Sequence, residues 1–154
     1  MSKCVVIGVT GGIAVYKALD VISALRKKDI EVHVIMTESA SKFVNPLTFQ
    51  SISQNMVVTD MFAEPKAWEI QHISLAQKAD LMLIAPATAN IIGKVANGIS
   101  DDMLSTTIMA ASKAKVIFAP AMNTHMYQNR IVQGNIEKLK SYGYDFIEPA
   151  SGRL

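Results

Sequence analysis

The sequence predicts a single-domain α/β fold in which helices flank both faces of a doubly wound parallel sheet. The chain has 154 residues, enough for one domain with a substantial core and without disulfides or metals. Short β-branched runs alternate along it with segments of helical periodicity, and this alternation favours parallel strands joined by crossover helices. We therefore expect a Rossmann-like or flavodoxin-like architecture, with ligands at the carboxyl ends of the strands.

The first 39 residues are predicted to form a strand, a helix and a second strand. Val5–Val9 is a β-branched run closed by Thr10-Gly11-Gly12, and apolar residues recur at helical spacing from Val15 to Leu25. Glu31–Met36 has the alternation of a strand and ends at Thr37-Glu38-Ser39, a helix-capping pattern. This stretch therefore has the pattern of a βαβ unit.

Periodicity is weaker between residues 41 and 67. Asn45-Pro46 predicts a turn before a short helix through Phe49 and Ile52, and Glu64-Pro65 predicts a loop. A helical pattern follows over His72–Ala79. The remaining strands are expected at Leu81–Ala85, Val116–Ala119 and Tyr144–Ile147, and the remaining helices at Asn90–Ala96, Asp102–Ala111 and Asn129–Ser141.

The charge balance and the hydropathy exclude several classes of partner. Net charge is +2, from 15 basic and 13 acidic residues that are scattered along the chain, so nucleic acid is not an expected partner. No apolar run approaches the roughly 18 residues of a membrane span, and the N-terminus lacks a signal-peptide pattern. We therefore expect no membrane association and a cytoplasmic location. A mean hydropathy of +0.25 is high for a soluble monomer and predicts a homo-oligomer.

Cysteine and histidine give no sign of a metal centre. The only cysteine, Cys4, opens a predicted buried strand and is expected to be a small core residue. No metal-ligand spacing joins His33, His72 and His125, so no metal site is expected. A histidine before a helix, such as His72, is ordinarily structural or exposed, although the unperturbed imidazole pKa of about 6.5 also suits acid–base catalysis.

Two loops of matching composition follow neighbouring predicted strands. They are Pro86-Ala87-Thr88-Ala89-Asn90 and Pro120-Ala121-Met122-Asn123. The carboxyl ends of parallel strands meet at one edge of the sheet, so both loops are expected to face one pocket. Asn90 and Asn123 then point polar side chains into that pocket, or each is a turn asparagine that bonds its own backbone.

The glycine turn after the first strand matches no standard nucleotide fingerprint. Gly8-Val9-Thr10-Gly11-Gly12 is neither a dinucleotide fingerprint nor a Walker A loop. Small residues at a helix start admit a phosphate to backbone N–H groups, but they equally suit a tight turn. Thr37 and Ser39 either donate hydroxyls to the same ligand or cap their own helix. Asp101-Asp102 is expected to cap the helix that follows it.

Four segments together resemble those of a known family. The segments are Thr10–Lys17, His72–Leu75, Ala85–Asn90 and Pro120–Tyr127. In this order they resemble the homo-oligomeric flavin-containing cysteine decarboxylases. The Pro-Ala-Met-Asn-x-x-Met-aromatic loop and the Pro-Ala-Thr-Ala-Asn loop are far more restrictive than any glycine pattern.

The resemblance implies that FMN binds in the predicted pocket. It assigns the cofactor contacts to Gly11, Gly12, Ile13, Thr37, Ser39, Thr88, Ala89, Asn90, Ile91 and Ala121. It also implies that His72 is a catalytic base and that Asn123, a catalytic and substrate-binding residue, holds the substrate carboxylate through its amide. The implied assembly is a trimer or a dodecamer.

The resemblance is strongest to members that act on 4'-phospho-N-pantothenoylcysteine. It implies oxidation of the cysteine side chain with FMN, loss of CO2, and formation of 4'-phosphopantetheine for coenzyme A biosynthesis. Two alternatives remain open from the sequence. One is decarboxylation of a peptidyl cysteine to an enethiol, and the other is a non-catalytic flavin-binding regulatory subunit.

The resemblance also implies a substrate flap after the last strand. In the family this flap carries a cysteine that donates a proton to the enethiol intermediate. We expect residues 1–154 to be the flavoprotein domain with that C-terminal flap missing, since the chain stops at Gly152-Arg153-Leu154. Cys4 is at the wrong end of the chain to replace the flap cysteine.

Overall fold

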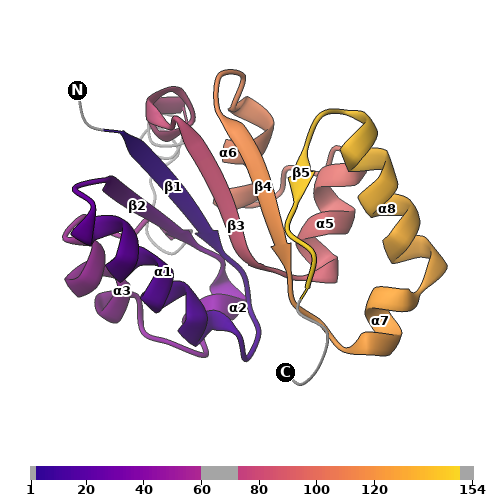
Figure 1. The fold of residues 1–154 in the computed structure, drawn as a ribbon, viewed down its shortest axis with the longest axis horizontal. Helices are drawn as coiled ribbons and strands as arrows, with labels where there is room; N and C mark the ends of the chain where they lie inside the picture. The colour runs from indigo at the N-terminus through magenta and orange to yellow at the C-terminus, as the bar shows by residue number, and fades with distance from the viewer. Residues whose placement is uncertain (1–2, 60–72, 150–154) are drawn as a thin grey trace.

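The computed structural model describes residues 3–59 and 73–149. Within these residues, five parallel strands form one sheet in the order β2-β1-β3-β4-β5 (Figure 1). The strands are β1 (Cys4–Val9), β2 (Glu31–Met36), β3 (Leu81–Ala87), β4 (Lys115–Pro120) and β5 (Asp145–Phe146). This order is the flavodoxin-like one, in which the chain starts at β1, adds β2 on one side and β3 on the other. The predicted fold class is confirmed.

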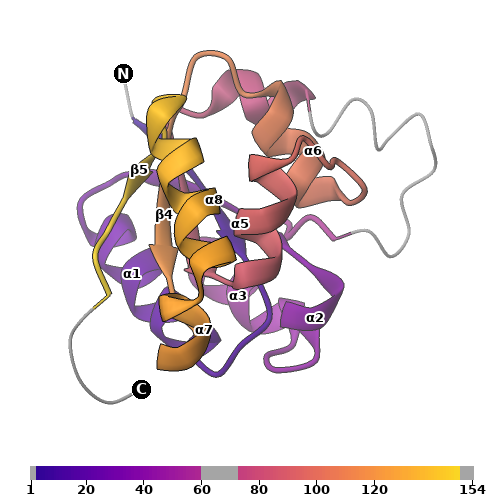
Figure 2. The ribbon, with the colours of Figure 1, turned by 90° about the vertical axis from the view of Figure 1, so that its right-hand side faces the viewer.

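Helices cover both faces of the sheet. One face carries α1 (Val15–Lys27) and α3 (Pro46–Ser53), and the other carries α5 (Ala89–Ala96), α6 (Met103–Ala110) and α8 (Arg130–Ser141). Figure 2 shows α5 and α8 side by side in front of the sheet. Two short helices, α2 (Glu38–Ser41) and α7 (Thr124–Gln128), lie beyond the carboxyl ends of β2 and β4. Residues 73–78 are also helical.

Strand β1 is buried on both faces because helices cover both. Val5, Ile7 and Val9 belong to the apolar cluster beneath α1 and α3, whereas Val6 belongs to the cluster beneath α5, α6 and α8. A Cβ on Gly8 would overlap the Leu104 side chain, so glycine here lets α6 approach the sheet closely. A nearly continuous apolar run is what such a central parallel strand requires.

The predicted helix caps at Thr37 and Asp102 are confirmed, and Asn45 and Asn129 are further caps that were not predicted. Thr37 Oγ1 accepts a hydrogen bond from Ala40 N, and Asn45 Oδ1 accepts one from Leu47 N. The carboxylate of Asp102 caps α6, and the amide oxygen of Asn129 caps α8. These side chains satisfy N–H groups that the first turn of a helix leaves without a partner.

Three predicted boundaries are corrected. Pro86 and Ala87 extend β3 rather than forming a loop, and helix α5 already begins at Ala89. The last strand is only Asp145–Phe146, and the helix α7 was not predicted. The predicted loop at Glu64-Pro65 and the residue His72 lie outside the described residues. Among the described residues, no helix is long and apolar enough to cross a membrane.

Candidate functional site

A cleft of about 1740 Å³ opens at the carboxyl ends of the strands, toward which the arrowheads in the lower part of Figure 1 point. Its walls come from the segments that follow β1, β2, β3 and β4. The cleft therefore lies at the switch point between β1 and β3, where the direction of strand addition reverses and an open α/β sheet leaves a crevice.

The cleft brings together the described residues that the sequence assigned to the site. Its lining includes Gly11, Gly12, Ile13, Thr37, Ser39, Thr88, Ala89, Asn90, Ile91, Ala121 and Asn123. These residues come from four separate stretches of the chain. His72 lies outside the described residues, so its position relative to the cleft stays a prediction.

Thr10 joins the end of β1 to the end of β3. Its side chain is buried, and its Oγ1 donates a hydrogen bond to Pro86 O at 2.5 Å and accepts one from Thr88 N at 3.2 Å. The peptide bond between Ala85 and Pro86, just before this carbonyl group, is cis. Sequence reasoning placed Thr10 in the glycine turn but missed this link, which fixes the turn against the start of α5.

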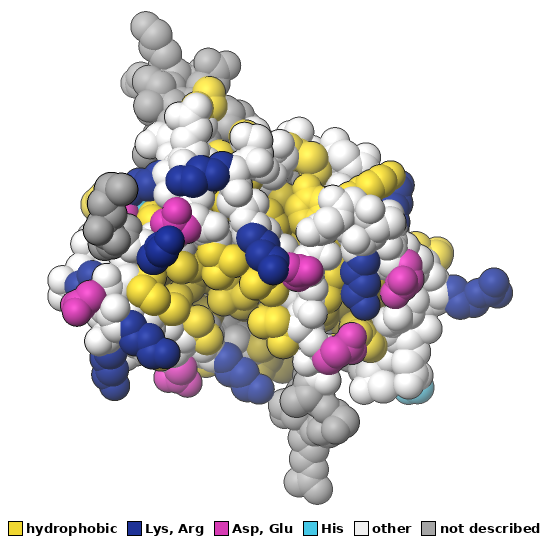
Figure 3. Space-filling view, turned by 45° about the horizontal axis from the view of Figure 1, so that its top comes forward, with side chains coloured by type: hydrophobic (Ala, Val, Ile, Leu, Met, Phe, Trp, Pro, Cys, Tyr) yellow, Lys and Arg dark blue, Asp and Glu magenta, His cyan; other side chains and the backbone are white. Residues whose placement is uncertain are grey.

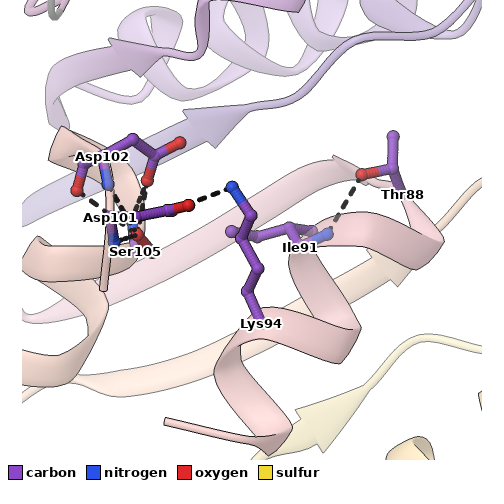
Figure 4. Close-up of polar contacts among 6 residues, drawn as sticks. All are labelled: Thr88, Ile91, Lys94, Asp101, Asp102 and Ser105. Carbon is purple, nitrogen blue, oxygen red and sulfur yellow. Dashed lines mark hydrogen bonds and ion pairs between the residues drawn. The ribbon is translucent and has the colours of Figure 1, made fainter. Parts of the chain in front are cut away.

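The first turn of α5 faces the cleft with free backbone donors. Thr88 caps the helix, because its Oγ1 accepts a hydrogen bond from Ile91 N at 3.3 Å (Figure 4). The N–H groups of Ala89 and Asn90 are then the ones that helix geometry leaves without an intrahelical acceptor. No acidic residue lies in this turn. The helix start is therefore suited to an anionic group such as a phosphate.

The two glycines after β1 have different roles. A Cβ on Gly11 would lie 2.6 Å from Ser39 Cβ and 3.0 Å from the Ser39 carbonyl carbon, so the turn packs directly against α2. A Cβ on Gly12 would meet nothing within 4 Å. Close packing alone thus explains Gly11, whereas Gly12 leaves open space at the cleft.

Asn123 combines the two interpretations that the sequence left open. Its Oδ1 accepts a hydrogen bond from His125 N at 2.8 Å, which makes it the N-cap of α7. It also lines the cleft. Because the cap uses the carbonyl end of the amide, the Nδ2 end remains as a hydrogen-bond donor.

Lys94 and Asp101 form an ion pair in the cleft wall that sequence reasoning missed. Lys94 Nζ lies 2.9 Å from Asp101 Oδ1 (Figure 4). The hydrogen bond from Lys94 holds the pKa of the Asp101 carboxyl below its ordinary value. One signal was available: Lys94 follows Asn90 by four residues, so both lie on the same side of α5. Asp102 instead caps α6 in a capping box with Ser105.

The rest of the lining is largely apolar. Ile13, Tyr16, Met122 and Met126 contribute to the walls, and Ile13 and Tyr16 are exposed despite their size. A cleft with apolar walls and a helix start at one end suits a ligand that has a flat apolar ring and an anionic tail.

Cys4 lies far from this cleft in the fold, at the opposite end of β1. Burial, and then a hydrogen bond to Glu31, raise the pKa of its thiol to about 11. The thiol is therefore protonated at neutral pH, and the prediction that Cys4 is a buried core residue is confirmed.

Comparison with known proteins gives one family and several close relatives. The profile of the family described as Flavoprotein matches residues 1–154. The chain is 55% identical over 153 residues to the coenzyme A biosynthesis bifunctional protein CoaBC of Bacillus subtilis, covering 99% of this chain and 37% of that protein. It is 43% identical over 155 residues to a protein of Streptococcus mutans named "Probable phosphopantothenoylcysteine decarboxylase", covering 100% of this chain and 87% of that protein.

A solved structure gives the same picture. The FMN-dependent cysteine decarboxylase SpaF matches with a TM-score of 0.88 and 32% identity, covering 97% of this chain and 86% of that one. The chain spans well under half the length of the bifunctional relative.

Proposed function

Because the chain belongs to the flavoprotein family, we propose that it binds FMN and decarboxylates 4'-phospho-N-pantothenoylcysteine to 4'-phosphopantetheine in coenzyme A biosynthesis. The observation that carries this proposal is the cleft at the switch point between β1 and β3, which gathers the described residues expected to hold FMN. The similarity to CoaBC and to the Streptococcus protein supports the choice of substrate.

The residues of the cleft fit FMN. The first-turn N–H groups of α5 and the Thr37 and Ser39 segment offer donors for the phosphate, and the apolar wall beside Ala121 offers a surface for the ring. The space beyond Gly12 lets that ligand come close to the backbone. When bound, FMN supplies the two-electron oxidation of the substrate cysteine on which loss of CO2 depends.

Asn123 orients the substrate carboxylate. Its Oδ1 is held by His125 N, so its Nδ2 hydrogens are the atoms that remain for an acceptor in the cleft. A carboxylate bonded there is fixed relative to the rest of the site, and such fixed placement of reacting groups lowers the barrier.

His72 acts as the base in the oxidation step under this proposal. The family resemblance is its support, together with the position of His72 just before the helical residues 73–78. The pH dependence of the decarboxylation rate tests this role of His72, since an imidazole changes charge near neutral pH.

Assembly and location complete the proposal. The exposed apolar side chains of Ile13 and Tyr16 at the cleft support association of identical chains into a trimer or a dodecamer. The protein acts on a small molecule in the cytoplasm, without nucleic acid or membrane as a partner.

The test combines a spectrum with mass spectrometry. Purified protein is expected to show the visible absorption of oxidised flavin and to remove CO2 from 4'-phospho-N-pantothenoylcysteine. A colourless protein that cannot be loaded with FMN would contradict the proposal.

A second candidate is decarboxylation of a peptide that ends in cysteine, which the similarity to the solved peptidyl-cysteine decarboxylase EpiD favours, at 28% identity and a TM-score of 0.85. Mass spectrometry after incubation with each substrate in turn separates the two. A product that has lost only CO2 indicates the complete reaction, whereas loss of CO2 and two hydrogens indicates an enethiol. FMN binding without turnover of either substrate would indicate a regulatory subunit.

A further inference from the structure

A second cluster of reactive side chains lies at the amino-terminal end of the sheet, opposite the cleft. It consists of Cys4, Glu31 and His33, from the first residues of β1 and β2. Figure 3 turns this end of the molecule toward the viewer and shows basic and acidic side chains around apolar ones. The proposed decarboxylation uses none of these three residues.

The register of the two strands brings the three side chains together. Cys4 is the direct partner of Glu31 across the parallel pair, and His33 follows Glu31 by two residues on the same strand. Direct partners and residues two apart point to the same face of a sheet. One sulfur, one carboxylate oxygen and one imidazole nitrogen consequently lie within 4.8 Å of one another.

The nitrogen of His33 is poorly satisfied in this arrangement. His33 Nε2 lies 3.3 Å from Glu31 Oε2, but this buried nitrogen makes no hydrogen bond to any described residue. The two atoms are within hydrogen-bond distance, but the groups are not aligned for a hydrogen bond. The Glu31 carboxylate already has Lys78 as a partner, so His33 Nε2 is the unsatisfied group, and a cation bonded to both side chains would give this nitrogen a partner.

We propose that Cys4, Glu31 and His33 bind a zinc-class divalent metal ion at the start of β1 and β2. Thiolate, imidazole and carboxylate are the donor types that zinc takes in proteins. Oxygen and nitrogen ligands about 2.0–2.1 Å from a tetrahedral ion are about 3.3 Å apart. That spacing equals the 3.3 Å between Glu31 Oε2 and His33 Nε2.

The remaining geometry is compatible with an ion that keeps one open position. The sulfur must move slightly inward, since a zinc thiolate and its oxygen neighbour lie about 3.5 Å apart. The thiol releases its proton on binding, as coordinating thiols do. Cys4 and His33 are largely buried while Glu31 is about one-third exposed, so water reaches the site from the Glu31 side. The ion would link the two strands across their register.

Lys78 occupies part of this site when no metal is bound. Its Nζ lies 3.0 Å from Glu31 Oε2, and its side chain is nearly half exposed. An ammonium group and a divalent ion compete for the same carboxylate, so Lys78 must move toward solvent when the metal binds. Removing the positive charge of Lys78 is therefore expected to strengthen metal binding.

The experiment measures zinc bound to the tag-free, flavin-loaded protein after treatment with a chelator. Equilibrium dialysis against Zn²⁺ is expected to give one tightly bound ion per chain. His33→Gln and Cys4→Ser are each expected to weaken binding about 100-fold or more, since even the loss of an outer hydrogen-bond partner costs 10–100-fold. His125→Gln removes an exposed histidine at the other end of the sheet and is the matched control.

Lys78→Gln keeps the proposal testable even where a buried variant folds poorly. Tighter zinc binding in that variant, together with a rise in melting temperature on adding zinc, supports the site, because loss of fold cannot produce a gain. The proposal is overturned if the wild-type chain binds no zinc under these conditions. It is equally overturned if His33→Gln binds zinc as tightly as the wild type.

Discussion

The two ends of the sheet are built from different kinds of polar group. At the carboxyl end, the cleft presents backbone N–H groups, small residues and capping side chains from consecutive stretches such as Thr88–Ile91. At the amino-terminal end, reactive side chains of the strands themselves come together, because Cys4 of β1 is the register partner of Glu31 of β2, and His33 follows Glu31 by two residues on the same strand. Local chain geometry forms the first site, and strand pairing forms the second.

The largest expected effect is at Asn123. Asn123→Asp keeps an oxygen to cap α7 but replaces the Nδ2 donor by a negative charge facing the substrate carboxylate. We expect kcat/KM to fall by roughly 100-fold or more, the usual cost of losing one oriented donor. The measurement is steady-state decarboxylation.

Asn129→Asp is the matched control, because Asn129 caps α8 in the same way but does not line the cleft. Equal losses in both variants would mean that capping, and not a carboxylate contact, explains Asn123.

Gly11→Ala tests how closely the turn after β1 is packed. Its Cβ would lie 2.6 Å from Ser39 Cβ, so α2 must shift. We expect the free energy of unfolding to fall by about 1–3 kcal/mol, as overpacking does. Urea unfolding measures this, with Gly12→Ala expected to leave stability unchanged because nothing lies within 4 Å of its Cβ. Similar unfolding curves for the two variants would show that α2 can shift at little cost in the free energy of unfolding.

Thr10→Val tests the bridge between β1 and β3. It leaves Pro86 O and Thr88 N without their buried partner, at a cost of about 1–3 kcal/mol in the free energy of unfolding. Thr106→Val is the control, since the Thr106 hydroxyl is buried and makes no hydrogen bond to a described residue. We expect that variant to match or exceed the wild type in urea unfolding. If both variants are destabilised equally, the hydrogen bonds of Thr10 do not explain the loss of stability.

The smallest effect concerns acid stability at the two ends. Asp101 at the cleft and Asp80 before β3 both have a pKa held below the ordinary value of 3.8, by Lys94 and by the backbone N–H of Cys4 respectively. A carboxyl group whose pKa is lowered in the folded state stabilises the protein above pH 3.8. That contribution to the free energy of unfolding is lost as the pH falls through the folded-state pKa.

Asp101→Asn and Asp80→Asn are therefore expected to be less stable than the wild type at neutral pH and to converge with it in acid. Added salt is expected to weaken the effect of Asp101 more, because the ion pair with Lys94 is the main cause of its lowered pKa and is screened. For Asp80 the main cause is the backbone hydrogen bond from Cys4, and the nearby Lys113 and Lys3 contribute less. Thermal unfolding over a pH and salt series measures both. A salt response as large for Asp80 would contradict this distinction.

Much of the cleft was predictable from the sequence because its chemistry is local. The capping pattern at Thr37 and the bounds of β2 follow from neighbouring residues, and the structure agrees with them. The boundary at Pro86 was not predictable, since β3 continues through it by pairing Ala87 with Pro120 across a register shift. That pairing depends on another strand.

Contacts between distant residues were missed for the same reason. Lys94 and Asp101 meet across the loop between two helices, and only their shared place in the cleft wall reveals the pair. Cys4 and Glu31 are direct neighbours only because β1 and β2 are in parallel register. The four-residue spacing from Asn90 places Lys94 on the cleft side of α5, but no spacing along the chain pairs Lys94 with Asp101 or Cys4 with Glu31.

The capping bond of Asn123 has a consequence for which molecules the proposed enzyme accepts. With its oxygen held by His125 N, the amide cannot rotate by half a turn to offer a carbonyl to the ligand. The side chain then presents only hydrogen-bond donors. These suit the oxygens of a free, ionised acid and offer no acceptor to the N–H of a cysteine amide. A cysteine inside a polypeptide keeps one carbonyl oxygen that can accept from Nδ2 but lacks the charge and the second oxygen of the free acid, so we expect it to bind more weakly.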